Sequence, residues 1–233
     1  MKYQVNALLW AGYPGQSGGQ AIVDIITGKR SPAGRLPITQ YPASYVSQIP
    51  MTDMTLRPNP MTGSQGRTYR WYTGTPVFEF GFGLHYTTFD VTWLSEGTPK
   101  PSYHISKLLS SANRSTHLDL GLLGSFRLNV RNSGKVSSDY VALLFMHTTA
   151  GPSPAPLKTL VSYGRAKNIA PNETQILVLN VTLGSMARVE EDGDSVLYPG
   201  RYDLWVDVGS GMAKRTFMLA GTKTRIIAWP QPR

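Results

Sequence analysis

The sequence contains no cysteine, so disulfide bonds, a thiolate nucleophile and a cysteine-based metal site are excluded. No apolar run approaches the roughly 18 residues that a membrane-spanning helix needs. Charged residues are scarce at 16%, which argues against a disordered polyelectrolyte and against a coiled coil. The chain does contain 23 glycines and 17 prolines, so we expect many turns and few long helices.

Positive charges are not clustered, although the net charge is +9. Lysines and arginines occur singly or in pairs, and no nucleic-acid-binding motif is present, so we expect a solvated basic surface and no nucleic-acid partner. A short apolar stretch at 7–11 is too short for the core of a signal peptide and ends at a Gly-Tyr-Pro sequence. We therefore expect no signal peptide and no membrane partner for this chain.

The first 42 residues have the pattern of one strand–helix–strand unit. Residues 5–10 form an apolar strand candidate, a glycine-rich turn covers 11–20, and a helix candidate at 21–28 is followed by an extended segment at 35–39. This order is typical of a βαβ unit in a parallel α/β layer. One unit cannot bury both faces of its sheet, so we predict that residues 1–42 are an incomplete end of an α/β sandwich domain.

An irregular segment at 43–85 leads into an all-β region at 86–233. Strand patterns occur at 87–93, 126–132 and 141–146, with a hairpin-type turn at 132–135. Further strand candidates lie at 159–167, 174–181, 200–208 and 213–220. About seven short strands with regular turns predict a β-sandwich of the immunoglobulin or fibronectin type III kind, with long loops at 96–117 and 183–199. We interpret the segment 43–85 as a wrapping loop or linker.

The motifs of known catalytic and metal sites are weak here. The glycine-rich turn contains a G-x-S-x-G pattern around Ser17, but only β-type sequence follows it, so a helix N-cap is the simpler role for Ser17. The four histidines are far apart and lack metal-ligand spacing, and the acidic turn at 190–194 lacks the spacing of a calcium loop. We expect no metal site and no cofactor.

Several of these segments resemble family 3 glycoside hydrolases. Residues 11–21 (AGYPGQSGGQA) and 26–37 (ITGKRSPAGRLP) resemble the end of that family's α/β sandwich domain. Residues 69–72 (YRWY) and 78–89 (FEFGFGLHYTTF) are similar to the stretch that leads into its C-terminal fibronectin type III-like domain. Further matches are VRNSGKV at 130–136 and LYPGRY at 197–202, and the stretches WAGYPGQ at 10–16, MTDM at 51–54 and LRP at 56–58 resemble the fungal exo-1,4-β-xylosidase branch.

The resemblance implies a secreted enzyme that hydrolyses glycosidic bonds of xylo-oligosaccharides with two carboxylates. Its barrel and the upstream part of its α/β domain, which carry both carboxylates in that family, have no counterpart here, so the chain is expected to be inactive alone. The residues agree, because only Asp24, Asp53 and Glu79 precede the β region, and Glu79 is expected to pair with an arginine. We predict no catalytic residue, and whether the chain is itself an enzyme stays uncertain.

Two other site predictions follow from the residues. Arg67, Tyr69, Arg70 and Trp71 are expected to line either a sugar site or a joint between domains. Sequons at Asn113, Asn172 and Asn180 are candidate glycosylation sites, consistent with an extracellular, secreted parent. The alternative function is a non-catalytic fibronectin-like module that binds a polysaccharide or a partner protein, with the exposed aromatic candidates Tyr103, Tyr163 and Trp229.

Overall fold

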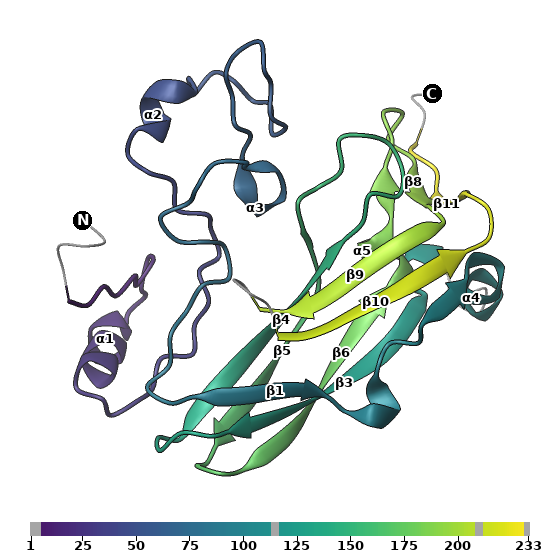
Figure 1. The fold of residues 1–233 in the computed structure, drawn as a ribbon. Coiled ribbons are helices and arrows are strands. Elements are labelled where there is room, and N and C mark those ends of the chain that lie inside the picture. Colours follow the sequence, from purple (N-terminus) through teal and green to yellow (C-terminus); the bar gives the residue numbers. More distant parts are fainter. Residues whose placement is uncertain (1–5, 113–116, 208–211, 231–233) are drawn as a thin grey trace.

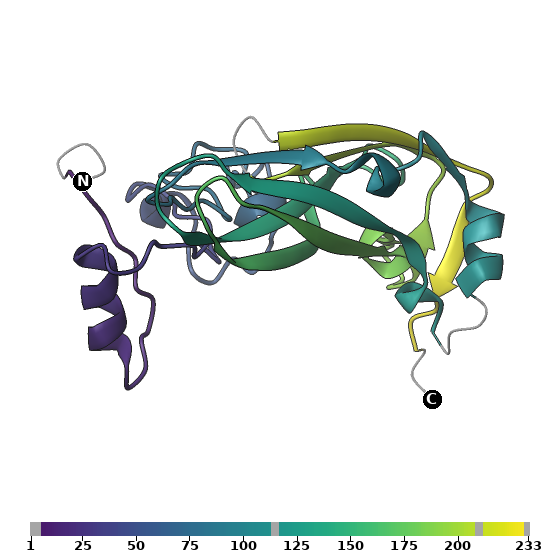
Figure 2. The same ribbon diagram turned by 90° about the horizontal axis from the view of Figure 1, so that it is seen from below.

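The computed structural model describes residues 6–112, 117–207 and 212–230. Most of the regular structure is in strands, which form an elongated two-layered body, while helix α1 stands apart at the other end of the molecule (Figures 1 and 2). The helices are α1 (Gly18–Ile26), α2 (Tyr45–Gln48), α3 (Thr68–Trp71), η1 (Ser95–Gly97), α4 (Ile105–Ala112), η2 (Leu118–Leu120) and α5 (Leu183–Met186). The strands are β1 (Phe89–Trp93), β2 (Ser102–His104), β3 (Leu122–Asn132), β4 (Ser138–His147), β5 (Thr159–Ile169), β6 (Thr174–Thr182), β7 (Arg188–Val189), β8 (Ser195–Leu197), β9 (Gly200–Val206), β10 (Met212–Ala220) and β11 (Thr224–Ile227).

Two sheets enclose the hydrophobic core. One has the order β1-β3-β6 and the other β2-β10-β9-β4-β5, and a small third sheet joins β11, β8 and β7. Alternate residues of the long strands face inward, as the period-two patterns predict. The inward positions include Phe126, Leu128, Val130, Tyr140, Leu144, Leu179, Val181, Tyr202, Leu204, Phe217 and Leu219. Burial of these large side chains provides most of the driving force for folding.

All seven strands predicted within residues 86–233 are present, as β1, β3, β4, β5, β6, β9 and β10. Apart from the eight-residue helix α4, the elements that the sequence did not indicate are short. Strand β2 and helix α4 lie in the predicted loop at 96–117, and α5, β7 and β8 lie in the predicted loop at 183–199. Segments of two to four residues are too short to show a periodic pattern, so only their tertiary neighbours define them.

The predicted hairpin at 132–135 is wrong, because the strands on its two sides belong to different sheets. Strand β3 pairs with β1 and β6, whereas β4 pairs with β5 and β9, so the chain crosses between the layers at this turn. The side chain of Asn132 holds the crossing in place and is fully buried. Its amide donates to the carbonyls of Val136 and Ile169 at 2.9 and 2.8 Å and accepts from Gly134 N and Thr87 Oγ1 at 3.1 and 2.7 Å.

The predicted βαβ unit is only partly present. Helix α1 is formed, with Gly28 just beyond its C-terminus at a φ of +74°. Ser17 occupies the N-cap position, but its side chain makes no capping hydrogen bond. The strands predicted at 5–10 and 35–39 are absent from the described residues, and Val5 lies outside them. Instead, Leu36 and Gln40 exchange backbone hydrogen bonds with the segment at 77–82. A strand needs a neighbour to satisfy its backbone groups, and residues 6–10 pair with no strand among the described residues.

Residues 41–85 contain only the short helices α2 and α3, and two aromatic clusters hold this segment in position. In the first, the rings of Tyr41 and Tyr45 stack at 4.1 Å, and Tyr72 packs edge-on against both. In the second, Tyr69 stacks on Phe80 at 4.3 Å, and both rings contact Phe145 of β4 edge-on. The second cluster attaches the segment to the outer face of the five-stranded sheet.

Replacing Asn132 with alanine tests the crossing between the two sheets. We expect Asn132→Ala to lower the free energy of unfolding by about 3 kcal/mol, because two buried carbonyls and two donors lose their partner. Urea denaturation of the chain measures this loss. The matched control is Asn129→Ala on the solvent side of the same strand, which should change stability by less than about 1 kcal/mol. Equal losses in the two variants would show that Asn132 does not hold the crossing.

Candidate site at the joint between the wrapping segment and the β-sandwich

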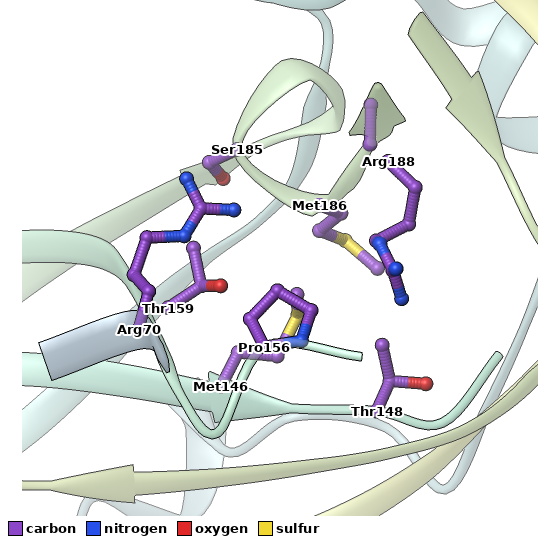
Figure 3. Close-up of a pocket in the computed structure, with 9 residues that line it drawn as sticks. Arg70, Met146, Thr148, Pro156, Thr159, Ser185, Met186 and Arg188 are labelled. Carbon is purple, nitrogen blue, oxygen red and sulfur yellow. The ribbon is translucent and has the colours of Figure 1, made fainter. Parts of the chain in front are cut away.

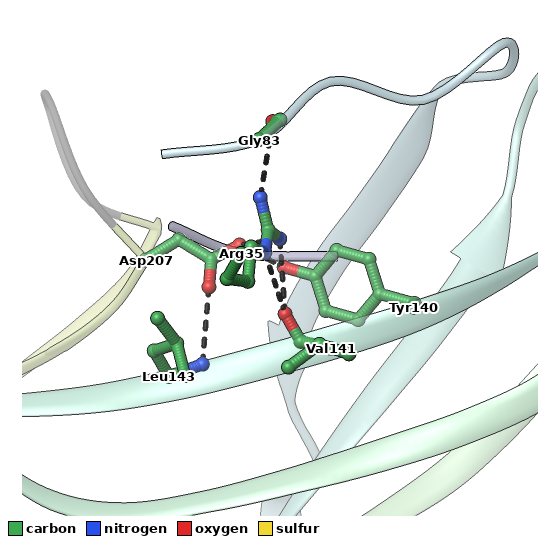
Figure 4. A network of polar contacts seen from close by, with 6 residues as sticks. All are labelled: Arg35, Gly83, Tyr140, Val141, Leu143 and Asp207. Atoms are coloured by element: carbon green, nitrogen blue, oxygen red, sulfur yellow. Dashed lines mark hydrogen bonds and ion pairs between the residues drawn. The ribbon is translucent and has the colours of Figure 1, made fainter. Parts of the chain in front are cut away.

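The joint is the region where the segments at 35–40 and 69–86 pack against strand β4 and the end of β9. Arg35 connects three parts of the chain at this joint (Figure 4). Its guanidinium donates to the Val141 carbonyl of β4 at 3.1 and 2.9 Å, to the Gly83 carbonyl at 3.2 Å, and to the Asp207 carboxylate at 2.8 Å. The side chains of Arg35 and Asp207 are only 10% and 8% exposed. A buried ion pair of this kind loses much of its hydration, so its stability depends on the additional hydrogen bonds that surround it.

Asp207 directly follows β9 and continues its backbone pairing with β4 by one residue. Its backbone N–H donates to the Leu143 carbonyl at 2.8 Å, and its carboxylate accepts from the Leu143 N–H at 3.1 Å and from the Tyr140 hydroxyl. The φ of +62° at Asp207 is a left-handed conformation that aspartate tolerates better than most residues. Burial and the neighbouring Asp207 charge raise the pKa of the Tyr140 hydroxyl, so that it remains a donor.

His85 lies beside this network, with the Pro32 backbone as a polar neighbour. Its ring contacts Phe89 and Tyr140 at centroid distances of 5.0 and 5.8 Å, and within the described part of the chain neither ring nitrogen has a hydrogen-bond partner. Burial, together with the positive charge of Arg35, lowers the pKa of His85 to about 4. The joint therefore favours the neutral imidazole.

Close packing at the joint also requires glycine at position 83. A Cβ on Gly83 would come within 2.3 Å of the Gly34 carbonyl oxygen. Nearby, Glu79 forms an ion pair with Lys158 at 2.7 Å, whereas the sequence predicted an arginine partner. The Lys158 ammonium also lies 5.1 Å from the centre of the Phe145 ring. The ion pair is therefore next to the aromatic cluster formed by Tyr69, Phe80 and Phe145.

The four residues predicted to line a sugar site or a joint do not converge on one point. Tyr69 packs within that aromatic cluster, as described above. Arg67 donates to the backbone carbonyls of Pro50 and Asp53 at 3.3 and 2.5 Å. Trp71 is buried, and the guanidinium of Arg57 covers its ring at 5.3 Å. These three side chains are thus engaged in internal contacts of the joint.

Arg70, the fourth residue, lines a small cavity together with Arg188 of β7 (Figure 3). The cavity measures about 10 Å³, which is the space of a single water molecule. Arg188 is 7% exposed and donates to the carbonyls of Ala150, Pro152 and Pro154 at 3.2, 2.7 and 3.1 Å. Burial lowers the pKa of Arg188, and the charges of Arg57 and Arg70 lower it further.

The candidate carboxylates of the N-terminal part have structural partners. Asp24 is buried against Gln20, Lys29 and Arg30, and Asp53 accepts from the backbone and hydroxyl of Thr55. Glu79 is paired with Lys158. Neighbouring donors and cations lower the pKa of both Asp24 and Asp53, the opposite of what a general acid near neutral pH requires.

The aromatic residues considered for a binding module come from distant elements. Tyr103 lies on β2 and Tyr163 on β5, which are the opposite edges of the five-stranded sheet. Tyr163 is 73% exposed, whereas Tyr103 is only partly exposed and packs edge-on against Phe217. Trp229 follows β11 and packs against Gly193. They therefore do not share one binding platform.

Two of the three predicted glycosylation sites are accessible. Asn172 lies in the turn between β5 and β6, and Asn180 projects from β6, and both are exposed. Asn113 lies outside the described residues. No group of three or more histidine, aspartate or glutamate side chains in the described ranges could hold a metal ion. None of the described helices has the length and apolar character to cross a bilayer.

Sequence patterns missed the residues that matter most at the joint. Arg35, Asp207, Asn132 and Arg188 are isolated polar residues, and nothing in their neighbourhood predicts burial. The available signal was weak: Asp207 continues the outward polar positions of an alternating strand pattern, two residues before a glycine. Their partners lie as far as 172 residues away along the chain, so only the tertiary structure identifies them.

Removing the positive charge at position 35 should destabilise the joint strongly. We expect Arg35→Met to lower the free energy of unfolding by about 3 kcal/mol, because it leaves the Asp207 carboxylate buried without a cation. Chemical denaturation measures the loss, and hydrogen exchange should show earlier opening of residues 78–86. As a control, Arg201→Met breaks an exposed pair with Asp203 and should cost less than about 1 kcal/mol. A cost for Arg35→Met no larger than the control's would contradict the role of the network.

His85 predicts a specific loss of stability in mild acid. Because its pKa is about 4 in the folded chain and near 6.5 when unfolded, the unfolded chain binds the proton first as the pH falls. The stability present above pH 6.5 should therefore decrease as the pH falls towards 4. His85→Phe keeps the ring packing but does not titrate, so its urea midpoint should fall less over the same range. Parallel pH profiles for the two proteins would disprove this linkage.

Comparison with known proteins agrees with the fold. Residues 1–86 match the sequence profile of the glycosyl hydrolase family 3 C-terminal domain. "Probable exo-1,4-beta-xylosidase bxlB" of Aspergillus fumigatus is 54% identical over 231 residues, and "Probable exo-1,4-beta-xylosidase xlnD" of Neosartorya fischeri is 53% identical over 230 residues. Each alignment covers 98% of this chain but only 29% of the relative's length.

Solved structures give the same result. A family 3 exo-β-xylosidase (XlnD), determined with a xylobiose aziridine activity-based probe, superimposes with a TM-score of 0.92 at 47% identity. The match covers 97% of this chain and 29% of that one. A β-D-glucoside glucohydrolase from Trichoderma reesei shares the fold with a TM-score of 0.63 at 24% identity, covering 91% of this chain and 30% of that one. These matches identify the chain as a C-terminal part of a family 3 glycosyl hydrolase, similar in sequence and structure to fungal exo-1,4-β-xylosidases.

Proposed function

We propose that this chain is the non-catalytic C-terminal portion of a secreted β-xylosidase that releases xylose from xylo-oligosaccharides. In this proposal, residues 1–42 complete an α/β sandwich domain, 43–85 wrap along the joint, and 86–233 form a fibronectin type III-like domain. The similarity to exo-1,4-β-xylosidases over 98% of the chain supports the substrate class. Arg67, Tyr69, Arg70 and Trp71 would then line the joint, and Asn172 and Asn180 would carry glycans.

The apolar surface of the N-terminal part carries this proposal. Helix α1 does not show the burial expected in a self-contained domain. Its charged Asp24 is buried, whereas its apolar Val23 and Ile26 are 52% and 70% exposed. Leu8, Leu9 and Trp10 in front of it are 44–55% exposed. Exposed apolar side chains concentrated in one part of a chain favour an interface with other protein. In the proposed parent enzyme, the preceding part of the α/β domain would cover it.

Inactivity of the isolated chain is the second part of the proposal. Hydrolysis with retention needs two carboxyl groups about 5–5.5 Å apart, one of them available as an acid. The carboxylates of the first 84 residues, as described above, are occupied by lysine, arginine, glutamine or threonine. The catalytic pair would come from the part of the enzyme that precedes these residues.

A chimera tests the proposal directly. The C-terminal 29% of the Aspergillus fumigatus relative is replaced by this chain, and hydrolysis of a chromogenic β-xyloside is compared between the chimera and the isolated chain. We expect activity in the chimera and none in the chain alone, because the chain would supply support and no catalytic group. Turnover by the isolated chain would refute its inactivity, and a soluble but inactive chimera would refute its role as the matching C-terminal portion.

Substitutions on α1 identify the surface responsible. Val23→Asp and Ile26→Asp should reduce the activity and solubility of the chimera, because each places a charge in the proposed interface. Ile176→Asp is the matched control, since Ile176 is 58% exposed on β6. If the helix and control substitutions reduced the activity of the chimera equally, the assignment of this interface would be wrong.

A further inference from the structure

The most exposed apolar side chains of the molecule belong to one stretch of the chain. Among the described residues, every large apolar side chain that is more than 80% exposed lies between residues 13 and 61, and the sandwich at 86–233 has none. These side chains are Tyr13, Val46, Met51, Met54 and Met61. All but the first lie within residues 46–61, which we call the methionine segment. Such a concentration of apolar side chains favours contact with other protein.

Hydrogen bonds hold the backbone of the methionine segment in a defined shape. The guanidinium of Arg67 donates to the carbonyls of Pro50 and Asp53 at 3.3 and 2.5 Å. Further along, the side chain of Asn59 accepts from the Met61 N–H at 3.0 Å. Helix α2, at the beginning of the segment, is anchored in the first aromatic cluster through its stacked tyrosine. The exposed side chains are therefore presented by an ordered backbone, which lowers the entropy cost of binding.

The methionine segment lies at the same end of the molecule as the apolar side chains of α1. Both ribbon views place α1, α2 and α3 at the end away from α4 and β11 (Figures 1 and 2). The aromatic cluster of Tyr69, Phe80 and Phe145 attaches the residues that follow the segment to the sandwich. Both sets of exposed apolar side chains are therefore found at the end where the proposed interface lies.

The length and the charge of the chain point to one occupant for this surface. The chain spans 29% of its relatives' length, so in the proposed parent most of the enzyme is available to cover this end. The solved exo-β-xylosidase contains the same fold over 97% of this chain, as part of a much longer protein. Within 46–61 only Asp53 and Arg57 are charged, and Thr55 and the Trp71 ring engage them internally. The segment therefore suits an apolar partner surface better than a charged one.

We propose that the methionine segment is a second docking surface, in addition to α1, for the part of the enzyme that precedes this chain. This inference rests on the proposed function and adds a partner surface to it. Methionine suits the contact, because its flexible thioether side chain adapts to irregular apolar surfaces. Since the aromatic cluster attaches the segment to the sandwich, docking would hold the sandwich in position relative to the catalytic part of the enzyme.

Oxidation by dilute hydrogen peroxide measures whether the segment is covered. Peroxide converts an accessible methionine thioether to the sulfoxide, and peptide mass spectrometry gives the rate at each methionine. The isolated chain is compared with the chimera in which it replaces the C-terminal 29% of the Aspergillus fumigatus relative. We expect Met51, Met54 and Met61 to oxidise about tenfold more slowly in the chimera. Met218, which is 48% exposed on β10, should keep its rate.

The outcomes separate this inference from the proposed function. Unchanged oxidation rates at the three methionines in an active chimera would overturn the docking surface and leave the proposed function intact. A decrease at Met218 as large as theirs would also overturn it, because the protection would not be specific to the segment. Slow, concentration-dependent oxidation in the isolated chain would assign the segment to a contact between copies of this chain instead. A soluble but inactive chimera would refute the proposed function, and the docking surface with it.

Substitutions distinguish docking from folding of the chain itself. Met51→Asp and Met61→Asp change side chains that are 93% and 94% exposed, so the urea midpoint of the isolated chain should not change. In the chimera, each should shorten the half-life of β-xylosidase activity at elevated temperature about tenfold, because a charge enters the apolar contact. Met218→Asp is the matched control and should change that half-life by less than about twofold. Loss of soluble chimera with Met51→Asp but not with Met218→Asp would support the docking surface, and equal half-lives for the three variants would overturn it.

Discussion

The carboxylate of Asp207 is the interaction on which the arrangement of this chain depends. It receives hydrogen bonds from Tyr140 and Leu143 of β4, and an ion pair from Arg35. Because Arg35 also binds the carbonyls of Val141 and Gly83, one buried charge pair joins the N-terminal part, the wrapping segment and two strands of the sandwich. Each group in the network compensates another that would be unfavourable alone in a buried position. The three parts of the chain can therefore pack together at the joint only in an arrangement that pairs all of these groups.

The two ends of the molecule satisfy the requirement for burial differently. The sandwich encloses its own core between two sheets, and crossings such as the one at Asn132 keep their polar groups paired. The N-terminal part instead exposes the apolar face of α1 and hides a carboxylate. A chain that spans 29% of its relatives' length can contain one complete domain and one that requires further protein. This difference agrees with the proposal that further protein covers the apolar side chains of α1.

The success of sequence interpretation followed the length of each pattern. Long alternating segments such as β3 and β6 were predicted, because each alternate side chain enters the same core. The turn at 132–135 was predicted as a hairpin, yet the turn sequence does not determine which strands pair on either side. The segment at 35–39, predicted as a strand, lies instead in a region whose backbone bonds to residues 77–82, and no parallel strand lies beside it among the described residues. Glu79 was predicted to pair with an arginine. Its partner is a cation, as predicted, but that cation is Lys158.

The amino-acid sequence by itself determined the strand positions, the helix at α1 and the resemblance to family 3 glycoside hydrolases, because these depend on local periodicity, turn residues and short motifs. Only the tertiary structure decided which sheet each strand joins, and which isolated polar residues are buried together. Arg35 and Asp207 are 172 positions apart, and Arg70 and Arg188, which line the same small cavity, are also far apart in the sequence. Local patterns carry no information on such pairs, since the free energy that brings them together comes from packing of the whole chain.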